Sequence, residues 1–266
     1  MTETNRIRVE ILGTGTSTGV PVLNCTCDIC TSPDDRDKRL RCSVYVQAGG
    51  VHLLIDTGPD FRQQAFRSGI KQVDAVLVTH HHFDHVMGMD DLRPFLFSNR
   101  TAIPVHAEPG SADVLRSMFS YIFRDGSYPG VPRLEMHEIR GPFEVTSRED
   151  VNRSIRITPI PAVHGSLDML GFRIGGFAYL TDVSEIPNAS FSLLDDLDVL
   201  VLDALRDRPH PMHMTIDQAV AVAGKIGAKQ TYFTHMSHEI LHADFEKRVP
   251  AGMSPAYDGL VFEASH

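Results

Sequence analysis

The chain has 266 residues, 42% of them hydrophobic, and Asp and Glu outnumber Lys and Arg by 34 to 25, giving a formal charge of −9. This size and composition suit an α/β protein with a sizeable buried core, and we expect one domain over residues 1–266. The acidic balance and the lack of a Lys- or Arg-rich run argue against a protein that grips long nucleic acids, since such binding depends on neutralising phosphates. A small anionic substrate is compatible with this charge, because a bound metal can supply local positive charge.

The sequence carries no signal for export or for membrane insertion. The first residues lack the long apolar core of a signal peptide, and no apolar stretch would span a bilayer, so we expect a cytoplasmic protein without a membrane partner. Three of the four cysteines cluster at Cys25, Cys27 and Cys30, which in a reducing compartment indicates metal more than disulfides. Cys42 stands apart, and we expect a buried thiol there. The sequence leaves open whether the chain forms a homodimer.

Short β-like runs alternate with helical patterns along the chain. The expected strands are rich in Val, Ile, Leu and Tyr and cover residues 8–12, 43–47, 52–55, 75–78, 155–160, 199–202 and 231–233. The expected helices cover residues 60–68, 111–121, 191–197 and 215–226, and Thr215 followed by Gln218 fits a capping box at the start of the last one. Pro and Gly are dense over residues 128–142, which we interpret as loops, and residues 95–160 hold no interpretable motif. This mixture in one continuous chain predicts helices that flank sheets.

A histidine-rich motif directly follows the apolar run at residues 74–78. His80, His82, Asp84 and His85 form the pattern H-x-H-x-D-H, and imidazole and carboxylate suit zinc and similar divalent ions. Alternate residues of an extended chain share a face, so His80 and His82 can converge on one ion. A following turn can then aim Asp84 and His85 at a second ion. The alternative is a solvated polar loop, but such a cluster at a strand end is rare by chance, so the motif indicates metal binding.

H-x-H-x-D-H after a strand resembles the signature of the metallo-β-lactamase superfamily, and the Leu-Ile-Asp-Thr-Gly run at 54–58 looks like its first motif. The resemblance implies an α/β fold, the αββα four-layer sandwich, with the site at one edge between two sheets. It also implies three further ligands, His164, Asp182 and His235, each of which follows an apolar, β-like run. Alone, each would be a capping or core-edge residue, but their order favours ligands. The implied first ion takes His80, His82 and His164, the second takes Asp84, His85 and His235, and Asp182 bridges both.

The resemblance implies a hydrolase with two divalent ions, Zn²⁺ or Mn²⁺, and a metal-bound hydroxide as nucleophile. Coordination lowers the pKa of bound water toward ~7, and two ions can hold the nucleophile and polarise a phosphoryl oxygen together. Asp84 is therefore counted among the catalytic residues as well as the ligands. Because the fold hosts lactamases, thioesterases, lactonases, ribonucleases and phosphodiesterases, other features must choose between these activities.

Two features near the N-terminus favour the phosphodiesterase branch. The Gly-rich run at residues 13–21 resembles its opening loop, whose backbone N–H groups can approach phosphate, although a tight turn is an equal alternative. Cys25, Cys27 and Cys30 together with His238 offer three thiolates and one imidazole for a tetrahedral structural zinc, in a zinc-binding loop near residues 25–30. This combination resembles the phosphoribosyl 1,2-cyclic phosphate phosphodiesterase family. The alternative is a set of free, reduced cysteines.

The third feature is the loop at residues 203–213, which precedes the capped helix. His213 resembles the histidine that phosphodiesterases place beside the metals, where it contacts substrate and protonates a leaving alkoxide. His210 is the second choice, and loop histidines in solvent are the remaining alternative. Arg93 is a candidate substrate contact, with an ion pair to a nearby Asp as the other interpretation.

The predicted function is hydrolysis of a small phosphodiester, such as a ribose or nucleotide cyclic phosphate. The alternatives are a β-lactamase, lactonase or thioesterase, a tRNA-processing nuclease, and a non-catalytic metal carrier. A secreted β-lactamase would need an export signal, and a tRNA-processing nuclease would need a basic or Gly/Pro-rich arm. A carrier has no need of two aligned ions.

Overall fold

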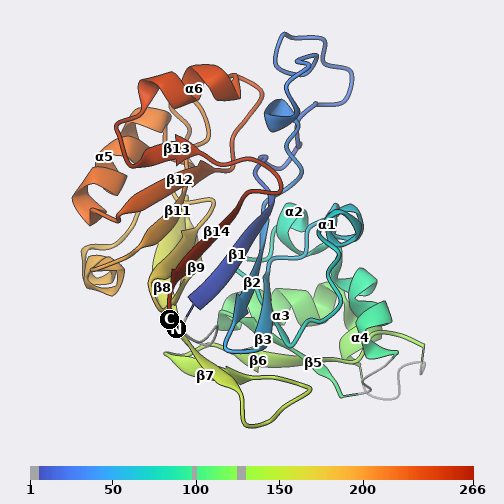
Figure 1. Ribbon diagram of the computed structural model, residues 1–266. Helices are drawn as coiled ribbons and strands as arrows, with labels where there is room; N and C mark the ends of the chain where they lie inside the picture. Colours follow the sequence, from blue (N-terminus) through green and yellow to red (C-terminus); the bar gives the residue numbers. More distant parts are fainter. Residues whose placement is uncertain (1–5, 98–100, 125–129) are drawn as a thin grey trace.

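The computed structural model describes residues 6–97, 101–124 and 130–266, and within them two seven-stranded sheets stack face to face (Figure 1). The first sheet has the strand order β14 (Val261–Ser265), β1 (Arg6–Gly13), β2 (Ser43–Ala48), β3 (Val51–Ile55), β4 (Ala75–Leu77), β5 (Ile103–Ala107) and β6 (Leu134–Glu138). The second has the order β13 (Met253–Pro255), β12 (Gln230–Thr234), β11 (Val199–Asp203), β10 (Phe177–Leu180), β9 (Leu167–Ile174), β8 (Ser154–His164) and β7 (Phe143–Thr146).

The core between the two sheets is made by alternate residues of facing strands. Ile7, Val9 and Ile11 point inward from β1, and Phe172 and Ile174 meet them from β9, all fully buried. Alternation is expected where one face of a strand meets a second sheet. Each sheet also has an apolar outer face, which needs a cover of helices.

Helices cover the outer face of each sheet, on opposite sides of the molecule (Figure 1). The cover of the first sheet consists of α1 (Phe61–Ser68), α2 (Phe83–Val86), the 3₁₀ helix η3 (Met89–Leu96), α3 (Pro109–Met118) and α4 (Ser120–Phe123). The cover of the second consists of the 3₁₀ helix η4 (Asn188–Leu194), α5 (Ile216–Ile226) and α6 (His242–Arg248). The predicted αββα architecture is therefore confirmed. In the described part of the chain, no helix is long and apolar enough to cross a membrane.

All seven expected strands are present, and so are the helices expected at residues 60–68 and 215–226, the latter with both hydrogen bonds of its capping box. The helix expected at 111–121 is interrupted at Phe119, whose φ of −108° and ψ of 39° separate α3 from α4. The helix expected at 191–197 is a 3₁₀ helix that begins earlier and ends at Leu194. In η4, Ser190 donates its hydroxyl to the carbonyl of Pro161, a side-chain bond of the kind that competes with regular helix.

The interpretation of residues 128–142 as loops was also partly wrong. Residues 134–138 form β6, which pairs in parallel with β5 and places His137 opposite His106. The dense Pro and Gly concealed a strand at the edge of the sheet, where few side chains are fully buried and the apolar signal is weak. Residues 128 and 129 of this segment lie outside the described residues.

Candidate metal centre and substrate site

Three histidines from two different sheets meet at one edge of the sandwich. His80 and His82 follow β4, and His164 is the last residue of β8. Nε2 of His80 lies 3.0 Å from Nδ1 of His82, and the ring of His164 lies 5.1 and 5.0 Å from the two other rings. One ligand atom from each lies within 4.8 Å of the others, a spacing that a single ion can bridge.

Two aspartates and two histidines form an adjoining group. Nε2 of His85 lies 3.2 Å from Oδ2 of Asp84 and 3.3 Å from Oδ1 of Asp182. Nε2 of His235 lies 3.2 Å from Oδ2 of Asp182. The same Asp182 oxygen lies 3.8 Å from Nε2 of His80, so this carboxylate stands between the two groups. That is the position expected of a residue that bridges two ions.

The chemistry of these side chains fits divalent cations. Nε2 of His85 and Nε2 of His235 are buried and make no hydrogen bond to any part of the described structure, although carboxylate oxygens lie 3.2 Å away. A buried polar atom without a partner is costly, so a native structure normally supplies one. A metal ion that accepts lone pairs from imidazole nitrogen and carboxylate oxygen would satisfy all of these atoms at once.

The pKa values of the candidate ligands follow from their burial and their charged neighbours. Burial, and next the charge of His85, lower the pKa of His80 well below its ordinary value, and burial likewise lowers the pKa of His164. Burial alone would raise the pKa of Asp182, but the neighbouring His235 and His85 outweigh it and hold that pKa well below the usual range. Neutral imidazole and ionised carboxylate are the forms that bind metals, and His80, His164 and Asp182 are held in those forms. Burial would lower the pKa values of His85 and His235, but Asp182 and the other nearby carboxylates outweigh it and raise both well above the ordinary value. An ion at these two rings would therefore displace a proton from each.

Unusual backbone conformations aim three side chains into this edge. Asp56, Asp182 and His235 have φ values of 62°, 57° and 60°, in the left-handed region that non-glycine residues rarely adopt. Each follows a strand within two residues, at the ends of β3, β10 and β12. Such conformations cost about 1 kcal/mol or more and collect at functional sites. Here the sharp turn brings a strand-end side chain over the edge of the sheet.

Asp56 supports His85 and was not predicted as a site residue. Its fully buried carboxylate accepts a hydrogen bond from Nδ1–H of His85 at 2.8 Å. The backbone N–H of Thr79 and its hydroxyl also donate to Asp56, at 2.9 and 2.8 Å. Such a carboxylate fixes the tautomer and the orientation of a ligand histidine. The Leu-Ile-Asp-Thr-Gly run at 54–58, which places Asp56 directly after an apolar strand, was the available signal.

Asp203 is the second carboxylate that sequence reasoning missed. It ends β11, is fully buried, and places Oδ1 3.4 Å from Nδ1 of His235 and 3.5 Å from Nδ1 of His213. Its other oxygen accepts a hydrogen bond from the backbone N–H of Met214 at 3.0 Å. One carboxylate therefore stands against a candidate ligand and against the candidate proton donor.

His213 lies beside both groups of candidate ligands. Its ring stacks on that of His235 at 4.7 Å between centroids, and the ring of His164 lies 4.8 Å away. His210, the second choice, has its ring 5.0 Å from that of His213, and its Nδ1 accepts a hydrogen bond from the backbone N–H of Met212. The position of His213 suits contact with a substrate, and its catalytic role stays a prediction.

Arg93 makes the ion pair that was the other interpretation of its role. Its Nη2 donates to both carboxylate oxygens of Asp90, at 2.8 and 2.9 Å, on η3. Both side chains are partly exposed. The structure does not bring Arg93 together with the candidate ligands, and a contact with substrate stays a prediction.

The three clustered cysteines meet His238. Their sulfur atoms lie 3.4, 3.5 and 3.5 Å from its Nδ1, for Cys25, Cys27 and Cys30 respectively. Zinc binds sulfur at about 2.3 Å and nitrogen at about 2.0 Å, so in a tetrahedral site each sulfur lies roughly 3.5 Å from the nitrogen. All four cysteines of the chain are free thiols. The spacing and the ligand types fit a zinc ion.

A buried arginine ties this loop to the segment that carries His238. Arg39 is fully buried, and its guanidinium donates to the carbonyls of Ser237 and Ile240 at 2.6 and 2.9 Å. It also lies 3.2 Å from Oδ1 of Asp37, which accepts a second hydrogen bond from the backbone N–H of His242. The segment between β1 and β2 extends from the top of the sandwich (Figure 1). The clamp therefore holds this projecting segment beside the edge where the candidate ligands meet.

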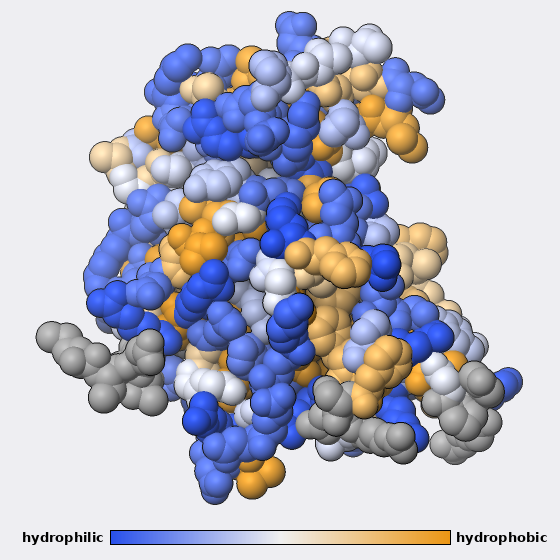
Figure 2. Space-filling model, turned by 45° about the vertical axis from the view of Figure 1, so that its right-hand side comes forward, coloured by the Kyte–Doolittle hydropathy of each residue, from blue (hydrophilic) through white to orange (hydrophobic). Residues whose placement is uncertain are grey.

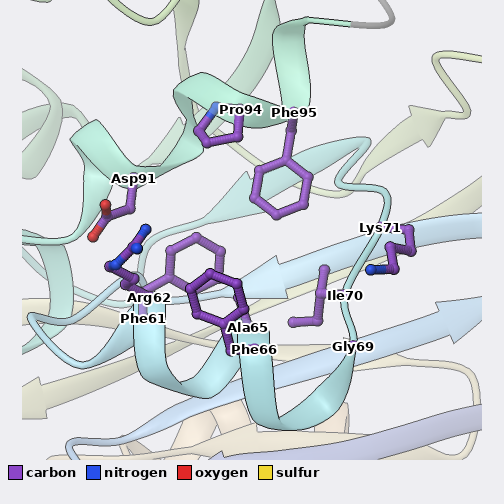
Figure 3. A pocket seen from close by; sticks show the side chains of 10 residues that line it. All are labelled: Phe61, Arg62, Ala65, Phe66, Gly69, Ile70, Lys71, Asp91, Pro94 and Phe95. Atoms are coloured by element: carbon purple, nitrogen blue, oxygen red, sulfur yellow. The ribbon is translucent and has the colours of Figure 1, made fainter.

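A separate hollow lies against α1, lined on one side by aromatic rings. It has a volume of about 250 Å³, and Phe61, Phe66 and Phe95 surround it, with Arg62 and Lys71 at its margin (Figure 3). None of the residues that line it is a candidate metal ligand. The candidate site therefore stays with the histidine and aspartate groups.

The model of the β-lactamase superfamily domain matches residues 52–236, a range that includes all seven candidate ligands of the two adjoining groups. The chain therefore belongs to the β-lactamase superfamily, and the predicted family and fold are confirmed. This fold implies that divalent metal is bound.

Among solved structures, the chain is similar to a new diphosphatase from the PhnP family, with 43% identity, 98% of each chain covered and a TM-score of 0.89. An octanoyltransferase of Porphyromonas gingivalis is 40% identical over 259 residues, 96% of this chain and 51% of the relative. A ribonuclease Z of a Bradyrhizobium strain is 38% identical over 90 residues, 32% of this chain and 30% of the relative. The chain thus spans about half or less of these two curated relatives. Relatives named as a diphosphatase and a ribonuclease support the prediction of an enzyme.

Proposed function

We propose that this chain is a metal-dependent phosphodiesterase that acts on a small anionic phosphoester. The observation that carries the proposal is the position of Asp182 between two adjoining groups of ligand side chains, with His213 beside both. Two aligned ions suit in-line displacement at phosphorus, because they can stabilise both the attacking and the leaving oxygen. A metal carrier would have no use for a shared carboxylate and a neighbouring proton donor.

The residues present would hold two ions, Zn²⁺ or Mn²⁺. His80, His82 and His164 would hold the first ion, and Asp84, His85 and His235 would hold the second. Asp182 would be shared by both. When bound, such ions activate water and polarise a phosphoryl oxygen. Asp56 and Asp203 face Nδ1 of His85 and of His235, and would hold the two rings so that Nε2 of each is free to bind an ion.

His213 supplies a proton to the leaving oxygen in this proposal. Its Nδ1 faces the buried carboxylate of Asp203 at 3.5 Å, which leaves Nε2 for the substrate. A carboxylate that faces one ring nitrogen sets the orientation of the imidazole, so that the other nitrogen can meet the leaving oxygen. The adjacent start of α5, which is capped by Thr215, adds a partial positive charge that favours phosphate.

The substrate class that we propose is a five-membered cyclic phosphate of ribose or of a nucleotide, with a phosphate monoester as product. The positive charge of two ions suits an anionic diester, and the relatives named as a diphosphatase and a ribonuclease support phosphoester chemistry. Hydrolysis of a diphosphate is the second candidate, favoured by the 43% identity to the PhnP-family diphosphatase. With a formal charge of −9, long nucleic acid is not the proposed partner.

We do not extend octanoyl transfer to this chain. The relative of that name is about twice as long as the part that matches, so its activity belongs to a longer protein. The two ion-binding groups of this chain also suit attack by water better than transfer of an acyl chain, because transfer requires that water be excluded.

Turnover by the zinc- or manganese-loaded protein tests the proposal. We expect hydrolysis of bis(p-nitrophenyl) phosphate and of a 2′,3′-cyclic nucleotide, and little turnover of nitrocefin or of a simple lactone. A nucleoside diphosphate tests the second candidate. Much faster cleavage of lactones or thioesters than of every phosphoester would overturn the proposed function.

A further inference from the structure

A second, larger hollow opens beside the candidate metal centre. It has a volume of about 540 Å³, within the range of small-molecule sites, and Asp84 forms part of its wall. Because Asp84 also belongs to the second group of candidate ligands, the hollow borders the metal centre. A substrate whose phosphate meets the ions can therefore extend into it.

Three exposed apolar side chains gather around this hollow. Leu23, Phe83 and Met87 line it, and their exposed fractions are 90%, 63% and 43%. Most of the surface in Figure 2 is hydrophilic, with hydrophobic residues in separate groups. Large apolar side chains that converge on one concavity mark a binding site better than scattered ones do.

The single turn of α2 positions two of these side chains. The backbone N–H of Met87 donates to the carbonyl of Phe83 at 3.1 Å, which completes one helical turn. Residues four apart lie on the same face of a helix, so the ring and the thioether point the same way. Phe83 also lies between His82 and Asp84 in the chain, so the ring and two candidate ligands belong to one short segment.

Polar groups complete the wall of the hollow. The hydroxyls of Ser17 and Thr18 come from the Gly-rich loop, and Arg41, whose Nε lies 3.0 Å from Oδ2 of Asp60, brings a guanidinium. An alkyl chain in this hollow would offer these polar groups no atom with which to form a hydrogen bond. A heteroaromatic ring offers flat apolar faces to Phe83 and Leu23 and polar atoms on its edge. The mixed lining therefore selects a ring of this kind over a lipid-like chain.

We infer that this hollow binds a planar heteroaromatic group, of the nucleobase type, that belongs to the substrate whose phosphate meets the metal centre. The inference rests on the proposed phosphodiesterase function and narrows it to esters of nucleoside-like alcohols. Phe83 stacks on the ring, Leu23 and Met87 cover its edge, and the wall hydroxyls bind its polar atoms.

The test compares two diesters that share one leaving group: the p-nitrophenyl ester of thymidine 5′-monophosphate, which carries a base, and methyl p-nitrophenyl phosphate, which does not. The readout is the ratio of their kcat/KM values. We expect the wild type to prefer the thymidine ester. Phe83→Ala should lower the ratio by about 10-fold to 100-fold, the range expected for loss of base stacking. Leu23→Ala should lower it several-fold, and Phe83→Tyr should keep it within about 3-fold of the wild type because stacking survives.

Phe66→Ala is the matched control. Phe66 is an exposed phenylalanine, with an exposed fraction of 73%, that lines the separate hollow beside α1, so its loss should leave the ratio unchanged. Metal content is measured for every variant, because Phe83 neighbours two candidate ligands. A wild type without preference, or an equal fall of the ratio in Phe66→Ala, would overturn the inference while leaving the phosphodiesterase proposal standing.

If neither ester is hydrolysed, the proposed function fails. A direct binding measurement then tests whether the hollow binds a nucleobase. Calorimetry with thymidine 5′-monophosphate on the zinc-loaded protein should then show binding that Phe83→Ala weakens about 10-fold or more. No binding, or binding that is indifferent to Phe83, would overturn the inference as well.

Discussion

Oδ1 of Asp203 lies 3.5 Å from Nδ1 of His213, and the same oxygen lies 3.4 Å from Nδ1 of His235. A single buried carboxylate at the end of β11 thus supports the proposed proton donor and one proposed metal ligand. The rings of the two histidines stack 4.7 Å apart, with 20° between their planes. A change at Asp203 should therefore disturb both functions of the site together.

We expect Asp203→Asn to lower kcat/KM on phosphodiesters by about 10-fold to 100-fold, the usual effect of removing a carboxylate behind a ligand histidine. The isosteric amide keeps the shape but loses the negative charge that faces both rings. Steady-state kinetics and metal analysis measure the change. Asp217→Asn, on the exposed side of α5, is the matched control and should behave as the wild type. Wild-type kinetics in Asp203→Asn would contradict the role of the carboxylate.

His213→Ala should lower kcat by about 10²-fold to 10⁴-fold on substrates with poor leaving groups, because a leaving alkoxide needs a proton. Metal content should stay intact, since His213 lies outside the proposed ligand set. The loss should shrink for p-nitrophenolate, which leaves without protonation. His210→Ala provides the comparison, because His210 is the second choice for this role and its ring lies 5.0 Å from that of His213. Equal losses on good and poor leaving groups would indicate a binding role instead.

Removal of the ions should abolish hydrolysis, and Zn²⁺ or Mn²⁺ should restore it. Asp182→Ala should lower activity to near background, because the variant loses the carboxylate shared by the two groups of candidate ligands. Asp168→Ala, an exposed aspartate on β9, serves as the control for a lost carboxylate. Activity near the wild-type rate in a sample verified as metal-free would rule out the two-ion mechanism.

The candidate ligands could be predicted because each lies at or within a few residues of the end of an apolar strand or in one dense motif. The sequence therefore displays both the ligand type and its place at the edge of a sheet. Asp203 also ends a strand, but its meaning depends on the path of the next ten residues, which bring His213 back against it. The left-handed conformations of Asp182 and His235 likewise depend on tertiary structure that overrides local preference.

The supporting parts of the site were harder to predict. Arg39 is fully buried, which is rare for arginine, and its acceptors lie about 200 residues away in the chain. Leu23 and Phe83 come from separate segments, so no local pattern links them to one hollow. The edge strand β6 was missed because a half-exposed strand has no continuous apolar run.

Cys27→Ser should remove about one zinc per chain and lower Tm while leaving the catalytic ligands in place. The Cys25, Cys27 and Cys30 sulfurs surround Nδ1 of His238 at the distances of a tetrahedral zinc, and thiolates favour zinc over Mn²⁺. Because such a site contributes to folding, we expect Tm to fall by roughly 5–15 °C, at about 2–4 °C for each kcal/mol lost. Activity should also fall, because loss of the zinc would loosen the cysteine loop. Arg39 can hold this loop beside the catalytic edge only while the loop and the segment that carries Ser237 are both ordered.

Cys42→Ala is the control for a lost thiol. Cys42 is buried directly before β2, donates a hydrogen bond to the carbonyl of Gly15 and does not belong to the cysteine cluster. It should keep its zinc. Metal analysis and X-ray absorption on protein exchanged into Mn²⁺ make the comparison: the wild type should retain one zinc with three sulfur ligands. A retained zinc without sulfur ligands, or a Cys25–Cys30 disulfide in freshly reduced protein, would contradict the site. The spacing of 3.4–3.5 Å between each sulfur and the imidazole nitrogen favours an ion at their centre, because it brings three thiols onto one nitrogen that can hydrogen-bond to only one of them.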